Sequence, residues 1–286
     1  MFINKNAYLT VCVMFMLWPL ESQPMASPDE DAGRPEAHEF LLPYIVISLG
    51  NCCRTAYYIR ETGLNSFSYP FDWFVTSCRT VRKAIKRNFK DYILPGNLED
   101  VNFFDSTLNI HVDPQPNRYV HDKYYDFQSR HDFPAHLPIT PELAQEVYNK
   151  YQRRIARFYR AITVATKKES GKADKHIYFV RRCITKKEAE KLNKTIQKKF
   201  PRLSYTLIAL DHREEAKHRW HIPNVKNIYF DNPTYRFNDL TQSYKYEPTV
   251  KLAEWKGIME RVLRRGGFVM QGAYPTFSER KEQPSN

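Results

Sequence analysis

Hydrophobic residues fall into two patterns along the chain, short continuous runs and helical stripes. Apolar runs rich in β-branched and aromatic residues occupy positions 44–49, 177–180 and 205–210, and each is typical of a buried strand; a further strand is expected over residues 226–230. Such runs lack the alternation expected of a strand with one solvated face. We therefore expect a sheet that is covered on both sides, in which the first three strands are neighbours.

Stripes of apolar residues at helical spacing lie between these runs. Gly50 ends the first run, and residues 53–63 have a helical composition. Further helices are expected over residues 77–89, 140–165, 185–200 and 250–263. Thr140 and Thr185 stand where a helix start needs a side-chain acceptor.

The alternation of strands and helices predicts an α/β fold, with a mainly parallel sheet flanked by helices in a single domain. Residues 91–133 are the exception, because Asn, Asp, Pro and aromatic residues interrupt any regular pattern there. Brief extended runs are expected within them at 108–112 and 124–127. We interpret residues 91–133 as an irregular, loop-rich insert of the kind that often carries functional residues.

The two ends of the chain differ from this folded body in composition. Residues 1–26 contain one Lys before the apolar run 7–20, which is shorter than the ~20 residues that span a bilayer but follows the order of a signal peptide. We expect a signal peptide or anchor that directs export, with a buried or interfacial segment of a cytoplasmic protein as the alternative. Residues 27–43 form an acidic, proline-rich linker, residues 44–267 the folded domain and residues 268–286 a polar tail.

The chain carries 44 Lys and Arg residues against 32 Asp and Glu residues, a net charge of +12. Most basic clusters repeat at helical spacing beside apolar residues, which indicates the solvated faces of amphipathic helices. A basic surface also attracts phosphate, anionic glycan or anionic lipid. Candidate residues for binding a glycan or phosphate are Arg153, Arg154, Arg181 and Arg182. Nucleic acid is not an expected partner, because no recognition motif accompanies the charge.

Five cysteines, at positions 12, 52, 53, 78 and 183, are too few and too irregularly spaced for a disulfide scaffold. No pair has the C-x-x-C spacing of a zinc knuckle, so no metal is expected. The sequence also lacks a G-x-G-x-x-G turn and a P-loop, and we expect no cofactor.

Cys53 has the best position for nucleophilic chemistry. It follows a strand and a glycine turn and stands at a predicted helix start, where backbone N–H groups and the helix dipole favour a thiolate. We therefore expect its pKa to lie well below that of a free cysteine. Asn51 and the same N–H groups are candidates for an oxyanion hole. The alternative is that Cys53 is a small core residue.

His131, in the irregular insert, is the best-placed histidine to act as the base for this thiol. His121, His136 and His212 are rival bases. Asp72 lies among aromatic residues, where an unpaired carboxylate is costly, and it is the candidate third member that orients the imidazole. A structural turn carboxylate is an equally good interpretation of Asp72.

Two sequence blocks carry a resemblance to a known family. The chain reads ISLGNCCRTA over residues 47–56 and SYPFDW over residues 68–73, and these blocks resemble the SLGxxCxxA…PFDW signature of the "putative papain-like cysteine peptidase" family, found largely in bacteria. The similarity extends over residues 44–232 and places the signature cysteine on Cys53, not Cys52. It implies a cysteine peptidase, with a peptide or other acyl compound as its substrate. Unlike papain, the chain has no glutamine shortly before this cysteine, which leaves another thiol chemistry open.

The leading hypothesis is a thiol-dependent hydrolase, most simply a cysteine peptidase, in which Cys53 attacks a carbonyl, His131 transfers the proton and Asp72 orients the imidazole. A second hypothesis is an acyl or glycosyl transferase with its site at the carboxyl ends of the strands. A third is a basic module that binds an anionic glycan or phosphate without catalysis. No membrane-spanning segment is expected beyond an N-terminal signal or anchor.

Overall fold

The structure of the protein is a computed structural model. The structure describes residues 40, 42–65, 67–101, 104–105, 110–111, 117–167, 175–230, 236–238, 243–245 and 248–270. The predicted leader, nearly all of the linker and most of the polar tail lie outside these residues, so what the sequence indicates for them stays a prediction. In the described part, no helix combines the length and the apolar character needed to cross a membrane.

Four parallel strands form the central sheet. They are β1 (Tyr44–Ser48), β8 (His176–Arg182), β9 (Tyr205–Asp211) and β10 (Val225–Tyr229), and they are arranged in the order β1-β8-β9-β10. The register pairs Ser48 with Val180 and Val180 with Ile208. The predicted α/β fold with a mainly parallel sheet is confirmed, as is the adjacency of the first three strands.

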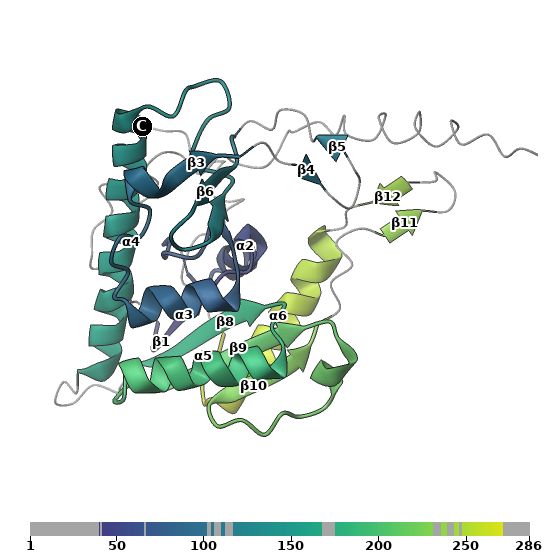
Figure 1. Ribbon diagram of the computed structural model, residues 1–286. Coiled ribbons are helices and arrows are strands. Elements are labelled where there is room, and N and C mark those ends of the chain that lie inside the picture. Colours follow the sequence, from purple (N-terminus) through teal and green to yellow (C-terminus); the bar gives the residue numbers. More distant parts are fainter. Residues whose placement is uncertain are drawn as a thin grey trace, which may run out of the picture.

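Helices cover both faces of this sheet (Figure 1). One face carries α2 (Cys53–Glu61) and α6 (Pro248–Arg265), and the other carries α3 (Cys78–Lys86), α4 (Pro141–Thr166) and α5 (Lys186–Lys199). The strand residues alternate accordingly. Tyr44 and Val46 lie in the core under α2 and α6, and Ile45 and Ile47 lie in the core under the other three helices. Burial on both faces explains the apolar runs of β1, β8 and β9.

The predicted helix starts are confirmed by their caps. The side chains of Ser77, Thr140 and Thr185 each accept a hydrogen bond of 3.1–3.2 Å from the backbone N–H three residues later. At Thr185 the capping box is complete, because the Glu188 carboxylate accepts in return from the Thr185 N–H (3.0 Å). Each cap satisfies a backbone donor that the helix itself leaves without a partner.

The insert folds, together with residues 74–76, around a second sheet that is small and antiparallel. Its strands are β2 (Phe74–Thr76), β3 (Leu98–Asp100), β6 (Val120–Asp122) and β7 (Phe127–Ser129), in the order β2-β7-β6-β3. The remaining described elements are β4 (Phe104–Asp105) paired with β5 (Ile110–His111), β11 (Arg236–Asn238) paired with β12 (Ser243–Lys245), and the 3-10 turns η3 (Pro95–Asn97) and η4 (Glu214–Lys217).

The prediction of an extended run over residues 124–127 is wrong for its first three residues. They belong to the turn between β6 and β7, in which Asp126 has a φ of +59°. The Asp122 side chain accepts hydrogen bonds from the N–H groups of Tyr125 (2.8 Å) and Ile93 (3.0 Å), which favours a turn over a strand. Of the run predicted over residues 108–112, the described part is strand β5.

Candidate functional site

The chain leaves β1 through a tight turn at the carboxyl end of the central sheet. Gly50 has a φ of +77°, and a Cβ atom there would lie 2.5 Å from Thr76 Oγ1 and 3.1 Å from Phe71 O. Both the backbone conformation and the available space therefore require glycine. The turn places Cys52 at the N-cap of α2 and Cys53 at the first helical position.

The Cys53 thiol is partly exposed, yet its dense surroundings dominate its acidity. Loss of hydration raises its pKa to about 11, and the neighbouring Cys52 adds to the rise. Smaller effects from Arg54, Arg130 and the backbone N–H of Cys53 itself lower the pKa. The expectation of a low pKa is therefore wrong, because burial outweighs the helix start. At neutral pH the group is a thiol.

The backbone of Asn51 is fastened to β2, while its side chain is left available. The Asn51 N–H donates to Thr76 Oγ1 (3.4 Å), and its carbonyl accepts from the Thr76 N–H (3.1 Å). Arg181 holds the same turn, since its Nη1 donates to Leu49 O (2.8 Å) and to Thr76 Oγ1 (2.9 Å). Within the part of the chain that the structure describes, the Asn51 side chain makes no hydrogen bond. Its amide can therefore serve as a donor beside Cys53.

His131 lies in the loop that follows β7. Because β2 and β7 pair antiparallel, with Phe74 opposite Ser129, the residue before β2 lies next to this loop. That residue is Trp73, whose ring meets the His131 ring edge-on, with centroids 5.5 Å apart and planes at 67°. Burial lowers the pKa of His131, and the charge of Asp132 opposes this shift. The imidazole is therefore neutral at neutral pH and can accept a proton.

Arg130, the residue before His131, influences both the histidine and the cysteine electrostatically. Its positive charge lowers the pKa of both Cys53 and His131, so its guanidinium lies within electrostatic range of each. The guanidinium carbon lies 4.9 Å from the ring centroid of Tyr119. No hydrogen bond joins Cys53 to His131 in the described ranges. The charge of Arg130 thus acts on both residues, and the thiol and the imidazole have no preformed hydrogen bond, as is common in apo enzymes.

Asp72 is buried, and it closes the turn that carries Trp73. Its Oδ2 accepts from the Tyr69 N–H (2.8 Å), and its own N–H donates to Tyr69 O (3.3 Å). Among the residues that the structure describes, Asp72 and His131 make no interaction with each other. This geometry favours the turn-carboxylate interpretation of Asp72 over direct orientation of the imidazole.

Asp132, the next residue along the chain, anchors the histidine loop in the core. Its Oδ1 pairs with Lys150 Nζ (2.6 Å), and its Oδ2 accepts from Ser129 Oγ (2.5 Å) and Tyr151 Oη (3.0 Å). Burial alone would raise the pKa of Asp132, but Lys150, Arg154 and these hydrogen bonds bring it down to about 2. The carboxylate stays ionised and fixes the base of the loop.

The four arginines predicted to bind an anion do not form one surface. Arg153 is exposed, whereas Arg154, Arg181 and Arg182 are buried. Arg181 holds the turn before α2, and the Arg182 guanidinium lies 5.4–5.5 Å from the centroids of two aromatic rings in the core under α2 and α6. These contacts tie Arg181 and Arg182 to the fold and do not support a glycan or phosphate site composed of all four arginines.

One family model matches residues 44–213, more than half of the chain, and its description is "Putative papain-like cysteine peptidase (DUF1796)". The chain belongs to this family. The match contains the turn before α2, the block around Trp73 and the loop of His131, and it ends just after β9. No curated protein and no solved structure shows a significant match to the chain.

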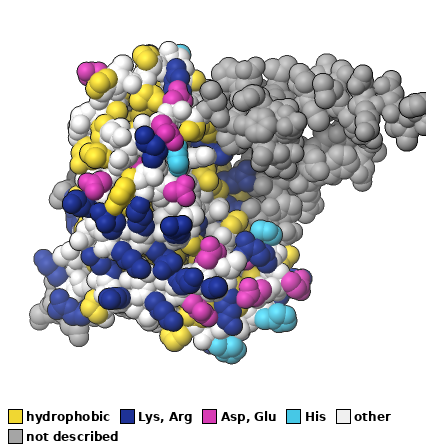
Figure 2. Space-filling view, in the orientation of Figure 1, with side chains coloured by type: hydrophobic (Ala, Val, Ile, Leu, Met, Phe, Trp, Pro, Cys, Tyr) yellow, Lys and Arg dark blue, Asp and Glu magenta, His cyan; other side chains and the backbone are white. Residues whose placement is uncertain are grey.

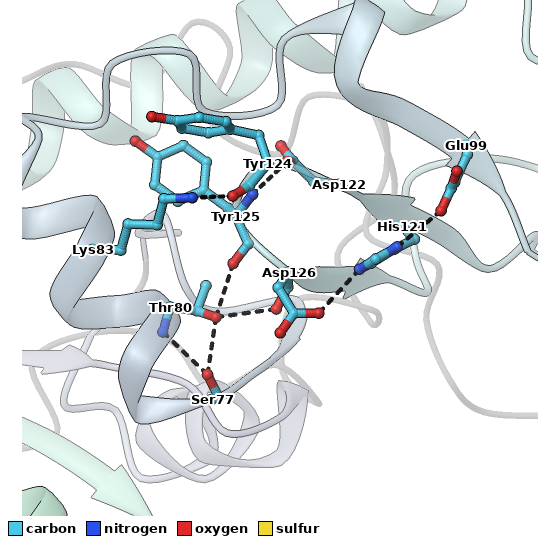
Figure 3. A network of polar contacts seen from close by, with 9 residues as sticks. All are labelled: Ser77, Thr80, Lys83, Glu99, His121, Asp122, Tyr124, Tyr125 and Asp126. Atoms are coloured by element: carbon cyan, nitrogen blue, oxygen red, sulfur yellow. Dashed lines mark hydrogen bonds and ion pairs between the residues drawn. The ribbon is translucent and has the colours of Figure 1, made fainter.

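Within the family region, the rival base His121 is held between two carboxylates. Its Nδ1 lies 3.1 Å from Glu99 Oε1, and its Nε2 lies 3.2 Å from Asp126 Oδ1 (Figure 3). Burial alone would lower the pKa of His121, but Glu99 and Asp126 raise it above the ordinary value. Thr80 Oγ1 donates to the carbonyl of Asp126 (3.0 Å), which docks the same turn on α3. Both ring nitrogens of His121 are therefore engaged in holding the second sheet together.

The other two rival histidines, His136 and His212, lie in loops. His136 is exposed in the loop before α4. His212 follows β9, and its Nδ1 lies 3.6 Å from Oδ1 of the buried Asp211. Like His131, neither histidine forms a hydrogen bond with Cys53 in the described part of the family region. His131 stays the predicted base, and the charge of Arg130 acts on both His131 and Cys53.

The described cysteines, at positions 52, 53, 78 and 183, are free thiols. Burial raises the pKa of both Cys78, at the start of α3, and Cys183, which follows β8. Across the described residues, no group of three His, Cys, Asp or Glu side chains is arranged to hold a metal ion.

Sequence reasoning missed the contributions of Trp73, Arg130 and Thr76. Trp73 stands in the SYPFDW block, so the signature itself carried a usable signal. Arg130 directly precedes His131, and its positive charge could have been expected to affect the pKa of the predicted base. Nothing local marks Thr76, because its contact with Asn51 joins segments that are distant in sequence.

Proposed function

We propose that this chain is a cysteine peptidase in which Cys53 is the nucleophile and His131 is the general base. The observation that carries the proposal is that the charge of Arg130 acts on both residues, Cys53 at the start of α2 and His131 in the loop after β7. Cys53 also stands at the carboxyl ends of parallel strands, the usual position of a site in an open α/β sheet. The family supports a peptide as the substrate.

The resting pair is a neutral thiol near a neutral imidazole, since burial raises the pKa of Cys53 to about 11 and lowers the pKa of His131. Deprotonation therefore accompanies attack. As Sγ bonds to the carbonyl carbon, the thiol proton moves to His131, and the imidazolium then gives it to the departing amine as the C–N bond breaks. Water, deprotonated by His131, hydrolyses the thioester and releases the acid and the free thiol.

Negative charge that develops on the carbonyl oxygen needs donors beside Cys53. The Asn51 amide and the first N–H groups of α2 fill this role in our proposal, aided by the positive end of the helix dipole. The Asn51 backbone is fixed through Thr76, which holds the residue in the turn before Cys53. Arg130 contributes positive charge to the same region.

Asp72 has an indirect role in this proposal. By closing the turn from Tyr69 it fixes the backbone that carries Trp73, and the Trp73 ring supports the His131 ring. Trp73 is then the positioning residue, in place of a carboxylate that orients the imidazole. Asp132 fixes the backbone next to His131 from the other side.

The test is cleavage of a diverse peptide library by the full-length chain, read by mass spectrometry. Wild type should cleave a defined subset, Cys53→Ala should lose the activity, and His131→Gln should reduce it by about 10²–10⁴-fold. Cys52→Ala is the matched control and should retain most of it. Cleavage that survives Cys53→Ala but not Cys52→Ala would refute the nucleophile, and wild type that hydrolyses small esters but no peptide would refute the substrate class.

A further inference from the structure

A separate feature lies on the solvent side of α3 and α5. The two helices are neighbours, and Arg82 Nε donates to Thr195 Oγ1 across them (3.4 Å) (Figure 1). Residues 79–90 and 186–202 carry thirteen Lys and Arg against two Glu, a net charge of +11 in a chain whose total is +12. These two segments are called the α3–α5 basic surface below.

The cations of the α3–α5 basic surface are not neutralised within the described part of the protein. None of the thirteen forms an ion pair there. Of its two acidic residues, Glu188 is occupied by the capping box with Thr185. Nine of the thirteen are exposed, namely Arg79, Lys86, Arg87, Lys90, Lys187, Lys191, Lys194, Lys198 and Arg202.

Four of the exposed lysines form a stripe along α5. Lys187, Lys191, Lys194 and Lys198 repeat at helical spacing, opposite the apolar side of the helix that packs into the core. The stripe is about 17 Å long at 1.5 Å per residue. Figure 2 shows Lys and Arg side chains as a band across this side of the molecule. Like charges at this spacing destabilise an isolated helix, so an anionic partner relieves a cost that the fold itself leaves uncompensated.

We propose that the α3–α5 basic surface binds the anionic lipid headgroups of a membrane surface. The surface is rich in lysine and spread over two helices, which suits diffuse attraction to many headgroups. Its exposed positions include no aromatic side chain on which bases could stack, which disfavours single-stranded nucleic acid. The sequence also contains the apolar run 7–20, and a short apolar anchor combined with a polybasic surface gives stable attachment where either alone is weak.

The test uses the full-length chain in co-sedimentation with vesicles of phosphatidylcholine alone or with about 30% phosphatidylserine. One variant changes the α5 stripe to glutamine (Lys187, Lys191, Lys194 and Lys198→Gln). The matched control removes four exposed charges from α6, on the opposite face of the sheet (Lys256, Arg261, Arg264 and Arg265→Gln). Each lysine near an anionic membrane contributes about fivefold to binding, so the α5 variant should bind phosphatidylserine vesicles at least about tenfold more weakly than wild type.

The α6 variant should keep its binding, and neutral vesicles should report only the contribution of the apolar run. Raising the salt concentration should weaken wild-type binding to anionic vesicles steeply, a measurement that needs no variant. Equal losses in the two variants, or equal wild-type binding to neutral and anionic vesicles, would overturn the proposal. Tighter binding to duplex RNA than to vesicles at equal phosphate concentration, lost in the α5 variant, would instead assign the surface to nucleic acid.

Discussion

The indole of Trp73 and the imidazole of His131 meet edge to face, with ring centroids 5.5 Å apart. This contact joins the SYPFDW block of the family signature to the loop that carries the proposed base. Trp73 is itself held, because its Nε1 donates to Ser68 Oγ (3.3 Å) and the Arg60 guanidinium lies over its ring. The signature block therefore contacts the His131 loop through the Trp73 ring, and its carboxylate, Asp72, closes the turn that carries this ring.

Replacement of Trp73 should change the acidity of His131. Burial lowers the pKa of His131, so Trp73→Ala should let this pKa rise towards its ordinary value. The acid limb of the rate–pH profile should move to higher pH, and the rate at neutral pH should fall. Trp220→Ala removes a buried indole outside the candidate site and should leave that limb in place. An unmoved limb in Trp73→Ala would refute the positioning role.

Removal of the Arg130 charge should make Cys53 less reactive. Arg130 lowers the pKa of Cys53 from a value that burial has already raised, so Arg130→Gln should raise it further and leave less thiolate at any given pH below it. Iodoacetamide labelling of Cys53, followed by peptide mapping, should slow accordingly. Arg153→Gln, which changes an exposed arginine, is the control. Equal labelling rates in wild type and Arg130→Gln would show that this arginine does not act on the thiol.

Gly50→Ala should destabilise the turn before Cys53. The residue has a φ of +77°, and the new Cβ would meet Thr76 Oγ1 at 2.5 Å, so strain and steric overlap should together cost about 1–3 kcal/mol. Gly96→Ala is the control, because no atom lies within 4 Å of a Cβ there. Denaturant unfolding measures the free energy of unfolding of both variants. A cost at Gly96 equal to that at Gly50 would contradict the account of this turn.

Asp132 should support the fold in a pH-dependent way. Its pKa of about 2 lies below the unfolded value of ~3.9, so its stabilisation is complete above the unfolded pKa and disappears as the pH falls through 2. Asp132→Asn should lower the free energy of unfolding at neutral pH by about 3–5 kcal/mol, because Lys150 loses its buried partner. Between pH 4 and 2 the variant should show a shallower loss of stability than wild type. Asp100→Asn, which breaks an exposed pair with Arg118, should cost less than about 1 kcal/mol.

Local signals were sufficient for most of the fold. Apolar runs identified strands β1, β8 and β9, and Thr140 and Thr185 identified helix starts, because capping involves only residues within one turn. The run over residues 124–127 was mistaken for a strand because its composition is aromatic. The turn there depends on Asp122, whose side chain also binds the distant Ile93 N–H.

The candidate site was less accessible to such reasoning. Arg154 and Arg181 were predicted to bind an anion, but both are buried. Arg154 interacts electrostatically with Asp132 and Arg181 donates to the carbonyl of Leu49, and the sequence alone does not reveal the long-range Arg181–Leu49 contact. The direction of the Cys53 pKa was mistaken for a similar reason. A helix start can be inferred from sequence, whereas the dense surroundings that remove water from the thiol are assembled by the tertiary fold.

The most direct test of the central claim is covalent modification of the full-length chain by a peptidyl acyloxymethyl ketone. Peptide mapping locates the adduct, and the time course gives the rate of modification. The account predicts an adduct on Cys53, with Cys52 unmodified, and a rate that falls by about 10²-fold or more in His131→Gln but not in His136→Gln. An adduct on Cys52 or Cys183 with Cys53 unmodified would contradict the claim, as would modification of Cys53 at the same rate in wild type and His131→Gln.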